Sequence, residues 1–159
     1  MTSQAERPRV VTFRIGRDLY AAPIEGVERV LRYEPPRRIP GGPSWVEGVV
    51  EYSGRVVPVV NLAQRLCLDD GEVGISTRIL VLSSVGEWMA IVVDSVLDVR
   101  SLGDLEPPPR SLRAAALDAM QGITRRDGDL VIVLDIGRLL ASSGDLPNQE
   151  PSREYAAVR

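Results

Sequence analysis

The sequence contains no histidine and no lysine, so all 19 of its basic residues are arginine. Without histidine, no side chain has an unperturbed pKa near neutrality that would suit general acid–base catalysis. Without lysine, Schiff-base chemistry is excluded, and so is a phosphate-binding loop that ends in Gly-Lys-Ser or Gly-Lys-Thr. Cys67 is the one cysteine, which excludes an internal disulfide and a zinc site of the usual Cys/His type. We interpret Cys67 as a small buried apolar residue, and we expect no metal or cofactor.

Aromatic side chains and net positive charge are also scarce. Aromatic residues make up 4% of the chain, and its formal net charge at pH 7 is −3. A protein that binds single-stranded nucleic acid needs stacking platforms and a basic track, so both values argue against nucleic acid as a partner. No apolar run reaches the length of a membrane span, and the N-terminal region lacks the apolar core of a signal peptide. We therefore expect a soluble, cytoplasmic protein with no direct membrane insertion.

The middle of the chain is an internal repeat. The run Val46–Leu62 reappears as Met120–Ile136 at a constant offset of 74, and the fainter run Tyr20–Val30 reappears as Met89–Val99 at an offset of 69. Internal repeats fix the architecture of a chain and are best recognised first. We read the pattern as one β unit that has been duplicated, with a groove between the two resulting lobes as the place to look for function.

Strand-like runs dominate both copies and are separated by turn signals. They are Val10–Ile15, Leu19–Ile24, Trp45–Tyr52, Arg55–Val60, Arg78–Leu82, Trp88–Val93, Val96–Val99 and a second hairpin from Met120 to Leu134, while Val27–Leu31 is read as a short extended or one-turn segment. Short helices are predicted at Leu62–Leu66 after an Asn61 cap, at Leu112–Ala119, and after an Asp135 cap.

These elements predict a mainly β fold, in which duplication gives two small β barrels packed together with a few short helices. A single domain is expected over residues 10–142. Residues 1–9 are predicted to form a disordered N-terminus, and residues 143–159 a flexible C-terminal tail.

Carboxylates are the remaining candidates for catalysis. Asp94 and Asp98 bracket one strand, but their counterparts in the first copy, Glu25 and Arg29, do not keep a pair of acids. General acid–base work needs two carboxyl groups in different environments, and we find no such pair. We therefore interpret the chain as a binding protein and not an enzyme. The alternatives are a small peptide-binding or nucleic-acid-binding barrel and, last, a carboxylate enzyme that uses Asp94 or Asp135.

Three segments carry a resemblance to a known family. The hairpin Val46–Leu62, with Gly48, Gly54 and Pro58, resembles the signature hairpin of the CheW-like family. Met89–Val96 resembles that family's Gly-Ile-Val-Val-Asp-x-Val strand, and Leu130–Leu140 its closing strand and helix. The resemblance covers roughly residues 10–142, which is the extent of a whole domain.

The resemblance implies a fold of two five-stranded β barrels and a non-catalytic role. Members of the family are adaptors in chemosensory signalling that couple a chemoreceptor to a CheA-type histidine kinase. One barrel edge packs on the kinase's regulatory domain, which is itself CheW-like, and the groove between the barrels grips the tip of the receptor's cytoplasmic hairpin. The resemblance therefore predicts these two partners, with other CheW-like domains as further candidates, and a place in receptor–kinase clusters.

The candidate binding residues are carried over one position at a time. Val27 and Val30 stand where the family presents apolar contacts for the receptor helix, although packing into the core would also explain both valines. Gly48 matches a glycine that allows a close backbone approach, and a bulge or the curvature of the barrel would explain it equally well.

Glu51, Ser53 and Arg29 mark departures from the family pattern. The family's hairpin tip is usually Asn-Leu-Arg-Gly, so Ser53 replaces an arginine, and Arg29 replaces that arginine's usual acidic partner. One interpretation is that the charges have been relocated, with Arg29 facing Glu51 or Glu28, so that the wrong partner is penalised. We predict an adaptor of a divergent, non-flagellar pathway. The alternative is a stand-alone CheW-like regulator that binds a kinase or other CheW-like domains without a receptor.

Overall fold

A computed structural model describes residues 7–65, 72–108 and 119–141 of the chain. Its strands are β1 (Arg9–Ile15), β2 (Asp18–Pro23), β3 (Val27–Arg32), β4 (Val46–Tyr52), β5 (Arg55–Val60), β6 (Arg78–Ser84), β7 (Glu87–Val93), β8 (Ser95–Ser101), β9 (Met120–Arg126) and β10 (Asp129–Leu134). The helical segments in these ranges are the 3-10 turn η2 (Ile24–Gly26) and the helices α1 (Leu62–Arg65) and α3 (Ile136–Ala141). The predicted mainly β fold class is confirmed.

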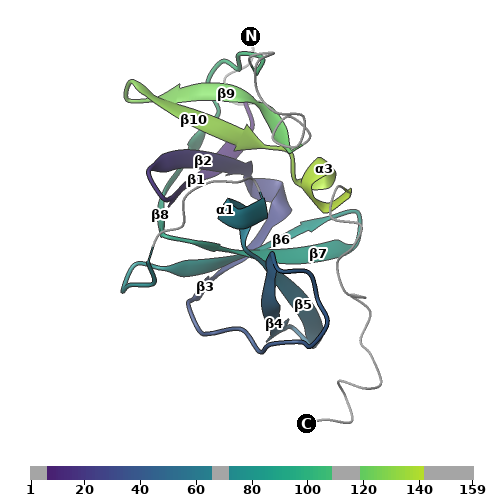
Figure 1. The fold of residues 1–159 in the computed structure, drawn as a ribbon. Coiled ribbons are helices and arrows are strands. Elements are labelled where there is room, and N and C mark those ends of the chain that lie inside the picture. Colours follow the sequence, from purple (N-terminus) through teal and green to yellow (C-terminus); the bar gives the residue numbers. More distant parts are fainter. Residues whose placement is uncertain (1–6, 66–71, 109–118, 142–159) are drawn as a thin grey trace.

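The strands form two five-stranded sheets that pack against each other (Figure 1). Sheet A has the order β8-β1-β2-β10-β9, and sheet B has the order β3-β6-β7-β5-β4. The first copy of the repeat supplies β1 to β5 with α1, and the second supplies β6 to β10 with α3. Each sheet therefore takes strands from both copies, so the duplication does not divide the chain into one lobe per copy.

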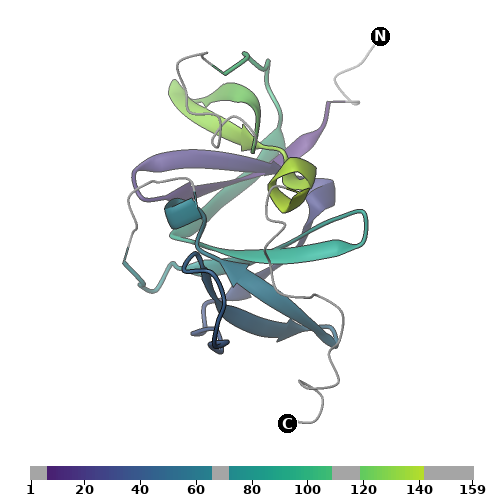
Figure 2. The ribbon, with the colours of Figure 1, turned by 45° about the vertical axis from the view of Figure 1, so that its right-hand side comes forward.

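Strand pairs between the copies hold each sheet together. In sheet A, β2 pairs with β10 in parallel and β1 pairs with β8 antiparallel. In sheet B, β7 pairs with β5 in parallel and β6 pairs with β3 antiparallel. The chain crosses between the sheets at η2 and again at Asp94, between β7 and β8 (Figure 2). At the second crossing the Asp94 carboxylate accepts the Gly16 N–H at 2.6 Å, and the Asp94 N–H donates to the Arg14 carbonyl at 2.8 Å. Asp94, a candidate acid in the sequence, thus fixes the point where the chain changes sheets.

A short backbone bridge joins the two edge strands of each sheet. In sheet B, Arg37, just beyond β3, exchanges hydrogen bonds of 2.9 and 2.8 Å with Val49 on β4. In sheet A, Glu106, beyond β8, exchanges hydrogen bonds of 2.8 and 2.9 Å with Ile123 on β9. These bridges bring the two edges of each sheet together, as closing a small barrel requires.

The equivalent hairpins β4–β5 and β9–β10 turn at Ser53-Gly54 and Asp127-Gly128. All four residues have a positive φ, between 51° and 90°. Two successive residues of this kind are typical of the two-residue turns whose twist matches the flanking strands. The hairpin turn predicted at Ser53-Gly54 is therefore confirmed.

Both predicted helix caps are also confirmed. The Asn61 side-chain oxygen accepts the Gln64 N–H at 2.9 Å, and the Asp135 carboxylate accepts the Arg138 N–H at 2.9 Å. Each cap thereby satisfies a backbone donor that the first turn of a helix leaves unpaired. The two helices that begin here lie at the level where the sheets meet (Figure 2).

Among the described residues, three apolar clusters form the core. The largest lies between the sheets and includes Phe13 and Tyr20, whose rings stack with their centroids 6.0 Å apart. A second cluster belongs to sheet A and a third to sheet B. Residues 66–71, which include Cys67, residues 109–118, which include most of the predicted helix Leu112–Ala119, and the termini 1–6 and 142–159 lie outside the described residues.

Candidate partner-binding surface

Val27 and Val30 lie on β3, an edge strand of sheet B, and face the same way. Residues three apart on a regular strand point to opposite faces. A register shift between Val27 and Arg29 corrects this, because Val27 pairs with Leu82 and Val30 with Leu80. Both leucines belong to the core cluster between the sheets. The bulge therefore places both valines on the face of sheet B that looks toward sheet A.

Exposure separates the two valines. Val27 is half-buried and packs against the core between the sheets, whereas Val30 is 42% exposed. Packing against the core thus explains the buried part of the Val27 side chain, whereas the exposed side chain of Val30 is available to contact a partner protein. A solvent-exposed valine on an edge strand is suited to contact an apolar surface of a partner.

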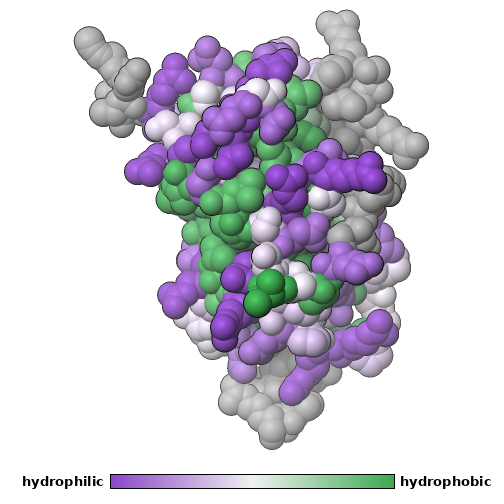
Figure 3. Space-filling view, turned by 90° about the vertical axis from the view of Figure 1, so that its left-hand side faces the viewer, coloured by the Kyte–Doolittle hydropathy of each residue, from purple (hydrophilic) through white to green (hydrophobic). Residues whose placement is uncertain are grey.

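Val96 and Val99 on β8 repeat the arrangement in sheet A. A register shift between Thr12 and Phe13 places them opposite Phe13 and Val11, and Val99 is also 42% exposed. The strands β3 and β8 lie on the same side of the molecule in Figure 1, and an apolar band crosses that side in Figure 3. We call Val27, Val30, Val96 and Val99 the valine surface.

Gly48 is buried in β4, at a bulge opposite β5. Its φ is +148°, and a Cβ at this position would lie 2.3 Å from the Arg37 carbonyl oxygen. The equivalent Gly122 approaches the Glu106 carbonyl oxygen in the same way, at 2.9 Å. Close approach to the bridge residue explains both glycines structurally, and a direct role of Gly48 in binding stays a prediction.

The remaining candidate residues lie on the two edge strands of sheet B, β3 and β4, and on the turn that follows β4. Arg29 is exposed on β3, Glu51 is exposed on β4, and Ser53 is exposed at the tip of the β4–β5 hairpin. The Glu28 carboxylate accepts a 2.6 Å hydrogen bond from the Ser83 hydroxyl. Arg29 takes part in none of the ion pairs recorded within residues 7–65, 72–108 and 119–141.

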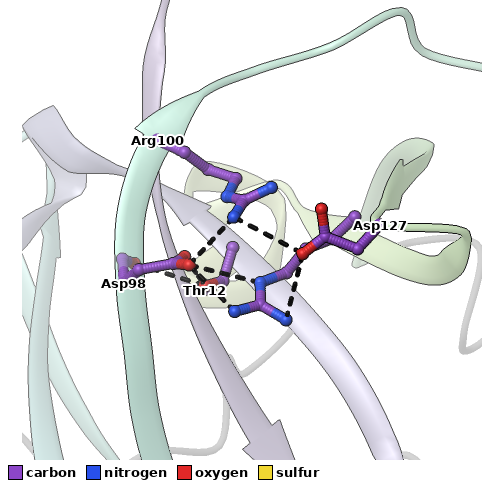
Figure 4. A network of polar contacts seen from close by, with 5 residues as sticks. Thr12, Asp98, Arg100 and Asp127 are labelled. Carbon is purple, nitrogen blue, oxygen red and sulfur yellow. Dashed lines mark hydrogen bonds and ion pairs between the residues drawn. The ribbon is translucent and has the colours of Figure 1, made fainter.

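Sheet A has a network of charges at the equivalent place (Figure 4). Asp98, 69 residues after Arg29, lies 2.9 Å from Arg126 and 3.1 Å from Arg100, and its carboxylate also accepts a hydrogen bond from the Thr12 hydroxyl. Arg100 lies 3.8 Å from Asp127, the equivalent of Ser53. Hydrogen bonds from Thr12 and Arg126 lower the pKa of Asp98 to about 2. The network joins the edge strand β8 to the edge strand β9 and its turn.

Sheet B has aromatic side chains where sheet A has this network. Tyr52, 74 residues before Arg126, packs against Trp88 with their ring centroids 5.8 Å apart. The Arg55 guanidinium lies 4.5 Å from the centre of the Trp88 ring, within the range of a cation–π contact. Equivalent places in the two sheets are therefore held differently, by ion pairs in sheet A and by tilted aromatic rings with a cation–π contact in sheet B.

Residues 9–144 match the family model for the CheW-like domain. This chain belongs to the CheW-like family. It is 27% identical over 148 residues to "Chemotaxis protein CheW" of Treponema pallidum, an alignment that covers 89% of this chain and 87% of that protein. It is 32% identical over 136 residues to "Protein FrzA" of Myxococcus xanthus, covering 82% and 84% of the two chains.

A solved CheW-like structure has the same fold. The crystal structure of the scaffolding protein TtCheW from Thermoanaerobacter tengcongensis superposes with a TM-score of 0.74 at 25% identity. The match covers 82% of this chain and 85% of that one. The resemblance of this sequence to the CheW-like family and its two-sheet architecture are thereby confirmed.

Sequence reasoning missed two members of the valine surface in this CheW-like chain. Val96 and Val99 follow Val27 and Val30 at the offset of 69, so the repeat carried the signal. Within the described ranges, no group of three or more carboxylate or cysteine side chains is arranged to hold a metal ion. No helix in the same ranges has the length and apolar character needed to cross a bilayer.

Proposed function

We propose that this chain is a non-catalytic, cytoplasmic adaptor that couples a chemoreceptor to a CheA-type histidine kinase. Membership of the CheW-like family supports a role in chemotaxis-type signalling. The observation that carries the proposal is the valine surface, an exposed apolar feature that bulges build on the edge strands of both sheets. An apolar surface of this kind suits the apolar face of a helix.

Each partner has its own part of the molecule in this proposal. The receptor's cytoplasmic hairpin tip docks on the valine surface, with Arg29 and the β4–β5 hairpin beside it. The regulatory domain of the kinase, or another CheW-like domain, packs on a sheet edge. The adaptor then works within receptor–kinase clusters by holding both partners at once.

Arg29 and Ser53 support a divergent pathway. They replace an acid and an arginine of the family pattern, and moving charges changes which partner is tolerated more than it changes stability. The second candidate function is a stand-alone regulator that binds a kinase without a receptor. It is favoured only by these same two positions.

Binding of two purified partners tests the proposal. The probes are the cytoplasmic fragment of a chemoreceptor and the regulatory domain of a CheA-type kinase from the same genome. Val30→Glu should abolish receptor binding and keep kinase binding, because it places a charge on the valine surface. Val85→Glu is the matched control, since Val85 is 99% exposed at the β6–β7 turn and lies outside the valine surface.

Kinase binding without any receptor binding by the unaltered protein would favour the stand-alone regulator. Binding to neither probe would overturn the adaptor role. Receptor binding that survives Val30→Glu would remove the valine surface from the proposal.

A further inference from the structure

Two arginines follow Val30 along the same face of sheet B. Arg32 pairs directly with Arg78 in the β3–β6 ladder, two positions from the pair formed by Val30 and Leu80. Residues two apart on a strand share a face. Arg32 and Arg78 therefore adjoin the valine surface at the end of β3.

Nothing recorded in the described part of the chain neutralises this pair. Arg78 donates to the carbonyls of Ile75 and Thr77, both at 2.9 Å, and neither arginine joins a recorded ion pair. Like charges directly opposite each other on neighbouring strands are destabilising. An anion placed between the two guanidinium groups would relieve that repulsion.

The repeat shows that the arginine pair belongs to one sheet only. The offset of 69 takes Arg78 back to Arg9 and Arg32 forward to Ser101, and these two residues pair with each other in sheet A. The two valines on β3 have counterparts on β8, but the pair of arginines is replaced by one arginine and a serine. The paired arginines beside the valine surface at the end of β3 therefore have no matching pair at the equivalent end of β8.

We propose that Arg32 and Arg78 bind a carboxylate of the segment that docks on the valine surface, and so fix the direction in which that segment lies. The planar guanidinium groups match a carboxylate in geometry and charge. The occupant is a protein segment with apolar and acidic side chains next to each other, because the valines require the first and the arginines the second. The inference rests on the proposed function and adds the chemistry of the receptor tip.

A double-mutant cycle tests it. The probe is the chemoreceptor's cytoplasmic fragment in two forms, native and with the aspartates and glutamates near its tip changed to asparagine and glutamine. Arg32→Ser with Arg78→Gln should weaken binding of the native fragment about tenfold at low salt, and the amidated fragment should lose the same factor with the unaltered adaptor. Combining both changes should bring little further loss, since the two sets of groups contact each other.

The control is Arg9→Gln, which removes an arginine at the equivalent position of sheet A and should change the affinity less than twofold. Arg32→Ser should leave the urea midpoint equal or raised, because it removes the repulsion, so that weaker binding is not a result of unfolding. Raising the salt concentration should weaken the native complex and leave that of the double variant nearly constant.

Three outcomes would overturn the assignment. They are equal affinity for the native and amidated fragments, full additivity of the two losses, and binding of a mixed-sequence oligonucleotide that the same double variant abolishes. Failure of the proposed function looks different, because the unaltered protein would then bind neither the receptor fragment nor the kinase domain. Loss of binding in Val30→Glu together with no effect of the double variant would refute the carboxylate pair alone.

Discussion

Replacing Gly48 with alanine should destabilise this protein more than the same change at any other glycine considered above. The alanine Cβ would lie 2.3 Å from the Arg37 carbonyl oxygen and 2.8 Å from its carbonyl carbon. Real Cβ contacts stay beyond 3.0 Å, so backbone must move by about 0.7 Å. The atoms in the way belong to the residue that bridges to Val49, so the movement acts on the closure of sheet B.

Two costs add at this position. A side chain at φ +148° brings backbone strain of about 1–3 kcal/mol. Loss of the two hydrogen bonds between Arg37 and Val49 costs about 0.5–1.5 kcal/mol each. Gly48→Ala should therefore lower the free energy of unfolding by about 2–6 kcal/mol, a large part of the roughly 5–15 kcal/mol typical of a domain.

Three glycines provide the comparison. Gly122→Ala meets the Glu106 carbonyl at 2.9 Å without a positive φ and should cost about 1–2 kcal/mol. Gly54→Ala has a φ of +77° but open space around it, so it isolates backbone strain of about 1–2 kcal/mol. Gly74→Ala has neither feature and should be close to neutral.

Urea unfolding gives each value from the midpoint at constant slope. A Gly48→Ala midpoint no lower than that of Gly54→Ala would refute the reasoning, because the bridge would then give way freely. Receptor binding by the Gly48→Ala protein, measured where it is folded, separates the two explanations of this glycine. Unchanged affinity would mean that Gly48 acts through the fold alone.

Further substitutions test three kinds of contact. Tyr20→Phe should stabilise the protein by about 1 kcal/mol in urea unfolding, because the buried Tyr20 hydroxyl has no hydrogen-bond partner among the described residues, and a loss of stability would refute this. The folded-state pKa of Asp98, about 2, lies below its ordinary 3.8, so its contribution is complete above about pH 4 and is lost as the pH falls through 2. Solvent screening limits that contribution to about 1 kcal/mol, and Asp98→Asn should flatten the decline in urea midpoint over this range. Asn61→Ala and Asp135→Ala should each cost about 1 kcal/mol by removing a helix cap, whereas Asn61→Asp should cost little.

Local chemistry made much of the fold predictable. The turn at Ser53-Gly54 and the caps at Asn61 and Asp135 depend on residues within three positions of each other, so the local sequence is enough to predict them. The repeat predicted two similar lobes because it spans whole strands and turns. The valines of β3 were predicted through the family resemblance, and the offset of 69 could have added those of β8.

Long-range pairing made the rest unpredictable. A β pattern specifies alternation along a strand and not which strand lies beside it, so the exchange of strands between the copies has no local signal. The bulge that aligns Val27 with Val30 comes from the pairing of β3 with β6 and is invisible in β3 itself. Asp98 was considered as a catalytic acid and set aside, and its contact with Arg126 depends on β8 and β9 closing one barrel.

The exchange of strands sets the order in which the protein becomes complete during synthesis. Within this domain β1 and β2 leave the ribosome before the other strands and can pair with each other at once, but sheet A is complete only when β8, β9 and β10 have followed. Sheet B is finished when β7 has emerged, although its own first strand, β3, is made later than β1 and β2. A chain cut between the copies cannot yield two separate lobes, since each fragment would hold parts of both sheets. A single ancestral copy could complete such sheets only by exchanging strands with a twin, as a two-fold symmetric dimer.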